Sequence, residues 1–408
     1  MLKRLLLVVI AFAAVLTGIG IISSRPDQDL STQYPTRSFS GKKTICLNMI
    51  VKNESAVITK CLASVKGIID YWVIVDTGST DGTQKLIKDF MRGIPGTLYE
   101  RPWKDFSHNR NEALAFAKNK ADYSLFIDAD EILLFSETFT KPDLDKDVYY
   151  INVKQKDSSE YLRWFLVNNS LDWKWKGVLH ELLESSQATT QGVITGVVNL
   201  SDTSLGARSK DPKKYLHDAE TLARALKEEP NNSRYQFYLA QSYANAGELC
   251  LALKEYQKRA EMVEGYAEET FVSLYIIARI QELLSMPSTI VIDSYMKAHN
   301  HTPSRLEPLY YLGLHHMRAK NYERAYDLLN KGSLLTPSSS NNLFVETDIG
   351  AWKLHSSLAE TCWNLRKIKE TIIACEKVAN AESAPTATRE EMRKNISSLR
   401  TGNYADSN

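Results

Sequence analysis

The segment Tyr123-Ser-Leu-Phe-Ile-Asp-Ala-Asp130 indicates the fold of this 408-residue chain more clearly than any other stretch. Its first five residues form a short, mostly apolar run, and two carboxylates close the segment, with Glu131 directly behind them. Such a run is typical of a buried strand that delivers its last side chains to the edge of a sheet. Paired carboxylates at a sheet edge hold a hard divalent cation, and that cation binds the oxygens of a diphosphate.

Strand and helix patterns alternate around this segment. Strands are predicted at 45–51, 71–75, 97–100 and 123–127, with helices at 55–65, 81–90 and 108–117. The alternation predicts an α/β domain with a mostly parallel sheet. Five polar side chains follow the predicted strand ends: Asn53, Glu54, Asp76, Asp128 and Asp130. Because ligands of such sheets bind beyond the carboxyl ends of the strands, we expect these side chains to gather at one edge.

The chain after Pro230 has a different composition, rich in Tyr, Ala and Leu, with a recurring pattern of small residues. Leu239-Ala240-x-x-Tyr243 with Ala252 and Tyr256 reappears as Leu312-Gly313-x-x-His316 with Ala325 and Leu329. Weaker copies comprise Ala278, Val291, Tyr295, Ala298 and Pro303, and then Leu358, Ala359, Thr371 and Cys375. Small residues at these places let paired helices approach closely and share one core. Position for position, the pattern resembles tetratricopeptide repeats, although unrelated amphipathic helices are the alternative.

Composition excludes some classes of function. Lys and Arg number 50 against 49 Asp and Glu, so no global field attracts nucleic acid, and we expect no nucleic-acid partner. The five cysteines are scattered, without metal-binding spacing, and are predicted to be buried thiols: Cys46, Cys61, Cys250, Cys362 and Cys375. A disulfide framework is not expected, although an oxidising compartment would permit one bridge.

The N-terminus predicts a membrane anchor. Lys3 and Arg4 precede an apolar stretch over 5–22, and a helix needs about 20 apolar residues to cross a bilayer. The alternative is a cleaved signal peptide, which would give a secreted or lumenal protein, but Ile21-Ile-Ser23 is a poor cleavage site. Basic residues flank the stretch on both sides, so the side of the membrane that holds the rest of the chain stays open.

Two motifs give the α/β domain a family resemblance. Asp76-Thr-Gly-Ser-Thr-Asp-Gly-Thr83 and Asp128-Ala-Asp130 resemble the nucleotide loop and the metal motif of family 2 glycosyltransferases, which have the GT-A fold. The segments Trp175-Lys-Gly-Val-Leu-His-Glu181 and Ala207-Arg-Ser-Lys-Asp-Pro212 are similar to members of that family that carry tetratricopeptide repeats. The resemblance implies a nucleoside-diphosphate sugar as donor, Mg²⁺ or Mn²⁺, and inverting hexosyl or N-acetylhexosaminyl transfer to a glycan, lipid or protein.

The expected organisation is therefore a GT-A α/β domain followed by an all-α tetratricopeptide solenoid. The predicted segments are a membrane anchor at 1–24, a flexible stem at 25–42, the glycosyltransferase domain at 43–215, the helical repeats at 216–400 and a disordered tail at 401–408. The repeats are a candidate surface for a protein partner, or for the acceptor.

Four residues are candidates for the nucleotide. Asp76 would accept hydrogen bonds from the base or ribose, since Gly78 and Gly82 allow close approach, whereas its structural alternative is a helix cap. The resemblance places Asn53 and Glu54 at the nucleoside, although both are also ordinary capping residues. Arg110 would reach a phosphate or hold Asp128 in place, and a surface salt bridge is the alternative.

The metal motif gives Asp130 as the stronger ligand. Asp128 would contact the ribose, or the metal through water. The resemblance suggests His180 as a further metal ligand or diphosphate contact, against the alternative of an ordinary polar histidine.

The acceptor needs a general base on the face opposite the leaving diphosphate. Glu181 is the candidate, with Asp172 as its competitor. Asp172 lies beside Trp173 and Trp175, which would stack on a sugar ring or pack as core.

A basic cluster follows the predicted site: Arg208, Lys210, Lys213 and Lys214. It would close over the diphosphate and offset the charge of the leaving group, with Arg208 and Lys210 the main candidates. The alternative is a solvated linker.

Two other classes of function compete with transfer. One is a catalytically inactive tetratricopeptide scaffold for protein–protein interaction, against which the intact Asp76, Asp128 and Asp130 argue. The other is nucleotidyl transfer, which would require a glycine-rich basic loop after the first strand. Val51-Lys-Asn-Glu54 has no such glycines.

Overall fold

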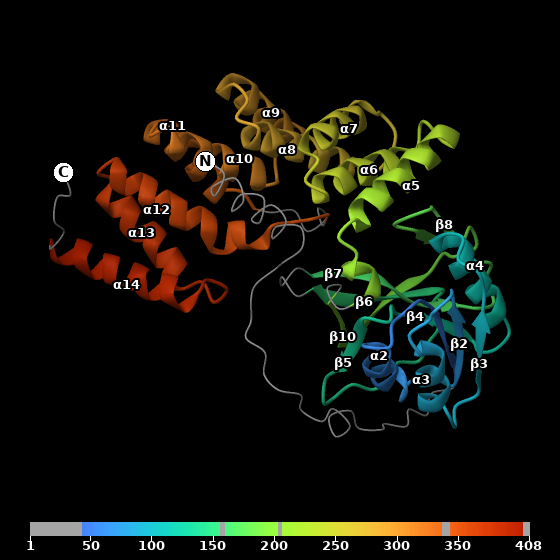
Figure 1. The fold of residues 1–408 in the computed structure, drawn as a ribbon. Helices are drawn as coiled ribbons and strands as arrows, with labels where there is room; N and C mark the ends of the chain where they lie inside the picture. The colour runs from blue at the N-terminus through green and yellow to red at the C-terminus, as the bar shows by residue number, and fades with distance from the viewer. Residues whose placement is uncertain (1–42, 156–159, 203–205, 337–342, 403–408) are drawn as a thin grey trace. The chain divides into compact units, whose positions relative to one another are not determined.

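The computed structural model describes residues 43–155, 160–202, 206–336 and 343–402, which form two compact units (Figure 1). The first unit ends at Pro230 and the second begins at Asn231. Helix α5 (Lys214–Glu228) lies in the first unit, so the division falls after this helix, whereas the boundary predicted at 215/216 falls near its start. The predicted anchor at 1–24 and stem at 25–42 lie outside the described residues, as does the predicted tail after 402.

The first unit is built on an eight-stranded sheet in the order β3-β2-β1-β4-β7-β6-β10-β5. The strands are β1 (Ile45–Val51), β2 (Tyr71–Asp76), β3 (Gly96–Glu100), β4 (Tyr123–Phe126), β5 (Glu131–Phe135), β6 (Val148–Gln155), β7 (Glu160–Asn168) and β10 (Gln191–Ser201). Strands β3, β2, β1 and β4 pair in parallel, as predicted. The remainder departs in part from the predicted mostly parallel sheet: β7 is antiparallel to both β4 and β6, and β5 to β10, whereas β6 and β10 pair in parallel. The sheet is mixed.

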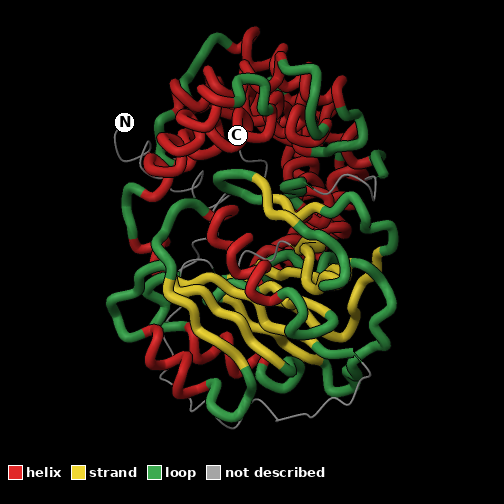
Figure 2. The backbone as a smooth tube through the Cα atoms, turned by 90° about the vertical axis from the view of Figure 1, so that its right-hand side faces the viewer, coloured by secondary structure: helices red, strands yellow, loops and turns green. Residues whose placement is uncertain are grey.

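Helices cover both faces of the parallel half of this sheet, as Figure 2 shows. Leu47 and Met49 of β1 pack with α2 (Ile58–Val65) and α3 (Thr83–Phe90) in one core cluster. Asn48 points the other way and donates to the Ala113 carbonyl of α4 (Phe106–Ala117) at 2.7 Å. Because both faces are covered, β1 is apolar along nearly its whole length rather than alternating.

A separate two-stranded ribbon, β8 (Lys174–Lys176) with β9 (Leu182–Glu184), packs against α4. Its connection carries His180 and Glu181. A short 3₁₀ helix, η2 (Ala207–Lys210), precedes α5.

The second unit consists of helices in antiparallel pairs. They are α6 (Ser233–Asn245), α7 (Leu249–Glu261), α8 (Ala267–Leu283), α9 (Ser288–His301), α10 (Glu307–Arg318), α11 (Tyr322–Ser333), η3 (Ile349–Lys353), α12 (Leu354–Asn364), α13 (Ile368–Ala379) and α14 (Thr386–Thr401). Contacts join α6 with α7, α8 with α9, α10 with α11 and α12 with α13. The predicted pairing is confirmed. Tyr243 and His316 of the pattern are half-buried and Pro303 is exposed, but most of its residues are buried, among them Ala252, Tyr256, Ala278, Tyr295, Ala298, Leu312, Ala325 and Leu329.

Gly313 shows why the pattern needs small residues. A Cβ at this position would lie 2.7 Å from side-chain atoms of the fully buried Leu329. We expect overpacking in Gly313→Ala to lower the free energy of unfolding by about 1–3 kcal/mol. This loss is larger than the gain in helix propensity, which is at most ~1 kcal/mol. Thermal denaturation beside Glu323→Ala, a substitution at an exposed position of α11, measures the effect. An unchanged or raised melting temperature would contradict this packing.

Four of the five cysteines are buried, as predicted, but Cys250 is exposed, because it lies at the solvent-facing start of α7. All five are free thiols. Within the described ranges, no helix is both long and apolar enough to cross a membrane.

Candidate functional site

Asp76 lies at the carboxyl end of β2 and shapes the loop that follows. Its Oδ1 accepts hydrogen bonds from the backbone N–H groups of Gly78 (2.9 Å) and Ser79 (2.8 Å). Gly78 and Gly82 have φ angles of +106° and +89°, which only glycine adopts readily. Asp76 is 1% exposed, and its Oδ2 has no hydrogen-bond partner among the residues that the structure describes. Oδ1 thus fixes the loop, and Oδ2 remains able to accept a hydrogen bond from a ligand.

Asn53 and Glu54 follow β1 and hold neighbouring loops. Asn53 Oδ1 accepts from the Thr80 backbone N–H at 2.8 Å. The Glu54 backbone N–H donates to Thr83 Oγ1 at 2.9 Å, and its carboxylate lies 3.3 Å from the Ala207 nitrogen, which donates to it. Both side chains are therefore at the predicted edge, with positions set by backbone hydrogen bonds.

Asp128 lies between two arginines. Arg110 Nη2 of α4 donates to Asp128 Oδ1 at 2.8 Å, and Arg163 Nη1 of β7 lies 3.8 Å from Oδ2. Burial alone would raise the pKa of Asp128, but these two guanidinium groups hold it below the ordinary value of 3.8. Of the roles predicted for Arg110, holding Asp128 is the one that these contacts match.

Glu131 is the buried support of this arrangement. It is 2% exposed, and its carboxylate accepts from Arg163 Nη1 at 2.8 Å, from Arg163 Nη2, from Asn199 Nδ2 at 2.9 Å and from the Asp128 backbone N–H at 3.1 Å. Arg163 was not predicted from the sequence. The available signal was an arginine in the middle of the apolar strand Tyr161-Leu-Arg-Trp-Phe165.

We expect Glu131→Gln to lower the free energy of unfolding by about 1.5–3 kcal/mol, the range for a hydrogen bond to a charged group, because Arg163 then loses its buried counter-charge. Urea denaturation measures this effect. Glu100→Gln, at an exposed position at the end of β3, is the matched control. If the two variants unfold at the same urea concentration, Glu131 does not support the site.

Asp130 lies among other carboxylates and interacts electrostatically with Lys214. Among the described residues, none forms a salt bridge to it. Burial, together with the nearby carboxylates of Asp128, Glu131 and Glu54, raises its pKa to about 7. The chain at Gly206 passes so close that a Cβ there would lie 2.6 Å from Asp130 Oδ2. Clustered carboxylates without a cation are the donor set that a hard divalent ion takes.

The predicted metal ligands are not assembled into a preformed centre. Within the described part of the chain, no three His, Cys, Asp or Glu side chains are grouped closely enough to hold a metal ion. The physical reason lies in Asp128, whose oxygens face Arg110 and Arg163. His180 is exposed on the β8–β9 connection, with a φ angle of +54°.

Glu181 shares Arg110 with Asp128. Its Oε2 lies 3.8 Å from Arg110 Nε, and the guanidinium carbon of Arg110 lies 5.1 Å from the centre of the Trp175 ring. The Glu181 side chain is only 11% exposed, and burial raises its pKa even though Arg110 opposes this shift. A shielded carboxylate with a raised pKa has the properties of a general base.

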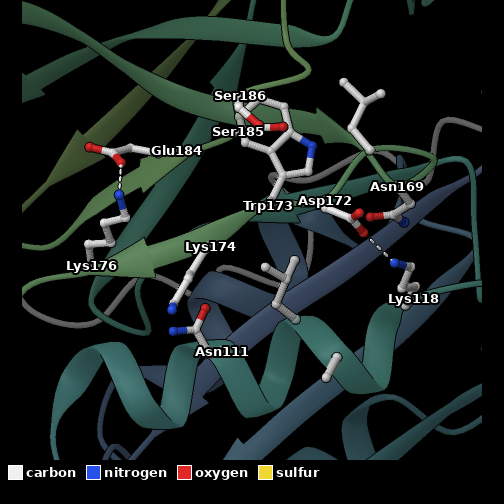
Figure 3. Close-up of a pocket in the computed structure, with 13 residues that line it drawn as sticks. Asn111, Lys118, Asn169, Asp172, Trp173, Lys174, Lys176, Glu184, Ser185 and Ser186 are labelled. Carbon is white, nitrogen blue, oxygen red and sulfur yellow. Dashed lines mark hydrogen bonds and ion pairs between the residues drawn. The ribbon is translucent and has the colours of Figure 1, made fainter.

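Asp172 lies elsewhere, in a pocket of about 920 Å³ between α4 and the β8–β9 ribbon (Figure 3). Its side chain is 73% exposed and pairs with Lys118 at 2.6 Å. Trp173 lines this pocket, whereas Trp175 is buried against Phe126 and Trp164. Of the two tryptophans, Trp175 is therefore the core residue.

Comparison with known proteins assigns a family to part of the first unit. The family model described as "Glycosyl transferase family 2" matches residues 46–140. Residues 46–140 are a family 2 glycosyltransferase domain. Glycosyltransferase SunS, derived from prophage SPbeta in Bacillus subtilis, is 39% identical over 93 residues, which is 23% of this chain and 21% of the relative. Lipopolysaccharide core biosynthesis glycosyltransferase LpsC of Rhizobium meliloti is 35% identical over 86 residues, 21% of this chain and 31% of the relative.

The comparisons also give a curated relative whose name describes repeats and a solved structure. TPR repeat-containing protein Synpcc7942_0270 of Synechococcus elongatus is 29% identical over 155 residues, 36% of this chain and 37% of the relative. The crystal structure of MamA has 16% sequence identity and a TM-score of 0.34, over 47% of this chain and 96% of that chain. This chain thus spans between 21% and 37% of the length of these three curated relatives.

The basic cluster follows the glycosyltransferase domain and is partly neutralised. Arg208 pairs with Asp218 of α5, and its guanidinium carbon lies 5.0 Å from the centre of the Phe106 ring. Lys210 is exposed, and its charge lowers the pKa of Glu54, although burial raises that pKa overall. Arg208 is thus paired with Asp218, whereas Lys210 interacts electrostatically with Glu54 at the edge where the strands end.

Proposed function

We propose that this chain transfers a sugar from a nucleoside-diphosphate donor to an acceptor glycan, lipid or protein, with the help of a divalent cation. The family 2 domain supports glycosyl transfer. The observation that supports the cation is the position of Asp130 among Asp128, Glu131 and Glu54, whose charges raise its pKa together with burial. Because Asp128 and Glu131 already pair with Arg110 and Arg163, a bound cation would chiefly offset the charges of Asp130 and Glu54.

The donor nucleoside would bind beside β1 and β2. The buried Asp76 Oδ2 without a hydrogen-bond partner is suited to accept from a ribose hydroxyl or a base N–H. The glycines at 78 and 82 leave the loop backbone open to close approach, since nothing lies within 4 Å of the position of an added Cβ. Asn53 and Glu54 border this loop.

Asp130 would hold the cation, with Asp128 and His180 as the further candidates. When bound, Mg²⁺ or Mn²⁺ neutralises the charge that develops on the leaving diphosphate. Arg110 and Arg163 keep Asp128 ionised and oriented. Lys210 adds positive charge beside Glu54, at the same edge.

We propose Glu181 as the general base. It accepts the proton of the acceptor nucleophile while that nucleophile attacks the anomeric carbon and the bond to the diphosphate breaks, which inverts the configuration. Arg110, shared by Asp128 and Glu181, supports this assignment because it connects the base to the metal edge. Asp172 is paired with Lys118 in the separate pocket of Figure 3.

A thermal-shift screen tests donor binding. We expect one nucleoside diphosphate, and its sugar conjugate, to raise the melting temperature in the presence of Mn²⁺, because a ligand at 100 times its Kd stabilises the folded state by about 2.7 kcal/mol. Asp76→Asn should reduce the shift. A panel covering uridine, guanosine, thymidine, adenosine and cytidine diphosphates that produces no shift would contradict donor binding.

We further propose that residues 1–24 anchor the chain in a membrane, on the basis of the apolar stretch 5–22. Deletion of 1–24 is expected to move the protein from the membrane to the soluble fraction with donor binding intact, because every candidate site residue lies at or after Asn53. Ultracentrifugal fractionation of both forms measures this. Recovery of the full-length protein, with its first residues intact, in the soluble fraction would contradict the anchor.

A further inference from the structure

The pocket of Figure 3, here called the flank pocket, lies between α4, residues 169–173 and the β8–β9 ribbon with residues 185–186. Its volume of about 920 Å³ falls within the ~300–1,000 Å³ that is usual for small-molecule sites. None of the residues assigned above to the donor or the cation lines it. The flank pocket is therefore a cavity of binding-site size to which no ligand has been assigned.

Hydrogen bonds fix the walls of the flank pocket. Asn111 of α4 donates to the Trp175 carbonyl oxygen of β8 at 2.8 Å and accepts from the Trp175 N–H at 2.9 Å. The indole N–H of Trp173 donates to the Asn168 carbonyl oxygen at 2.9 Å, which restricts rotation of the ring. Because these walls are already held in place, a ligand that binds between them loses little affinity to ordering of the protein.

One wall of the flank pocket is apolar. Trp173, Leu114 and Leu171 line it, and Trp173 is half-buried, so part of its ring remains open to a ligand. The indole N–H already has its hydrogen-bond partner, which leaves the ring face as the part available for contact. The C–H groups on the face of a sugar ring pack against such an aromatic surface.

The polar side chains of the flank pocket both donate and accept hydrogen bonds. Lys118 pairs with Asp172 at 2.6 Å and Lys176 with Glu184 at 2.7 Å. Among the described residues, Lys174 has no ion-pair partner and is free to donate, while the Asp172 carboxylate keeps further acceptor positions. Sugar hydroxyls match this mixed set because each both donates and accepts. A lipid chain would instead bury these charged groups, which is costly.

The flank pocket begins beside the proposed base. Asn111 at one end follows Arg110, whose Nε lies 3.8 Å from Glu181 Oε2, and both Arg110 and Asn111 contact Trp175. Lys118 lines the other end, and the seven residues of helix between the two ends span about 10 Å. A chain of sugar units whose reacting hydroxyl lies at Glu181 can thus extend along α4 into the pocket.

We propose that the flank pocket binds the sugar units of an acceptor glycan that lie beyond the unit receiving the transferred sugar, with one ring stacked on Trp173 and hydroxyl groups bonded to Lys174 and Asp172. This inference rests on the proposed sugar transfer, and it narrows the acceptor to a glycan.

Calorimetric titration of the full chain without donor measures this binding. The probes are maltotetraose, cellotetraose, tetra-N-acetylchitotetraose and tetragalacturonate. We expect at least one of them to bind with a Kd below about 1 mM. Trp173→Ala should weaken that binding by at least about tenfold, because the stacking surface is lost, and Trp173→Phe should weaken it less. Trp103→Ala, which removes an exposed tryptophan outside the pocket, is the matched control.

A second variant obstructs the flank pocket without changing the core. Ala115 is an exposed residue of α4 that lines the pocket, and arginine is a good helix former, so Ala115→Arg adds bulk there and keeps the helix. We expect it to weaken tetrasaccharide binding by at least about tenfold. Ala387→Arg, at an exposed position of α14, is its control. Binding that persists unchanged in Ala115→Arg and in folded Trp173→Ala would overturn the proposal.

The parent chain separates this inference from sugar transfer itself. Release of nucleoside diphosphate from a sugar donor, with none of the four tetrasaccharides bound at about 1 mM, would overturn the flank pocket alone. Tetrasaccharide binding that depends on Trp173, with no release from any donor, would contradict sugar transfer, whereas the pocket would still be a saccharide site.

Discussion

Asp130→Asn is expected to lower the rate of sugar transfer by at least about 100-fold while the chain remains folded, because removing one preorganised electrostatic contact to developing charge commonly costs 10²–10³ in rate. The substitution keeps the shape of the side chain and removes the charged oxygen that we propose as the cation ligand. It also removes one of four neighbouring negative charges, so no loss of melting temperature is expected.

Calorimetric titration of Mn²⁺ in the presence of a nucleoside diphosphate measures the cause of that loss. The Asp130→Asn variant should bind Mn²⁺ more weakly, and Asp89→Asn, which changes an exposed carboxylate of α3, should not. Equal Mn²⁺ affinity and equal turnover in the parent chain and the Asp130→Asn variant would exclude Asp130 as a ligand.

Glu181→Gln is expected to reduce turnover by roughly 10²–10⁴-fold, the usual contribution of general-base catalysis, with the donor Kd nearly unchanged. Glutamine keeps the size and hydrogen-bonding ability of the side chain but cannot accept the proton. The near-complete burial of Glu181 and its position beside Arg110 are the structural reasons for assigning it this role.

Two matched variants separate catalysis from structure. Glu184→Gln changes an exposed carboxylate of the same ribbon, paired with Lys176, and should retain parental turnover. A purely structural role for Glu181 would show as a lower melting temperature. If Asp172→Asn loses turnover while Glu181→Gln does not, the base is Asp172.

The four parallel strands β1 to β4 and the carboxylate edge could be predicted because their signals are local, whereas β5 to β10 were not predicted. Buried runs such as Ile45–Val51 and Tyr71–Asp76 are continuous in sequence, and the ends of parallel strands meet at one edge whatever else the chain does. The paired helices of the second unit were likewise predicted from short-range spacing of small residues.

The support of the site could not be predicted in this way. Glu131 and Arg163 are separated by 32 residues, and their contact depends on β7 inserting antiparallel beside β4. Arg208 is paired with Asp218 for a similar reason, since the connection into α5 determines which acid it meets. Such contacts depend on tertiary packing, which no local pattern encodes.

The most direct test of the central proposal is release of nucleoside diphosphate from a panel of nucleoside-diphosphate sugars by the purified chain, with Mn²⁺ and with a chelator. The account predicts release from at least one donor with Mn²⁺, loss of that activity with the chelator, and loss in the Asp130→Asn variant. Absence of release from every donor, or equal rates with Mn²⁺, with the chelator and in the Asp130→Asn variant, would contradict it.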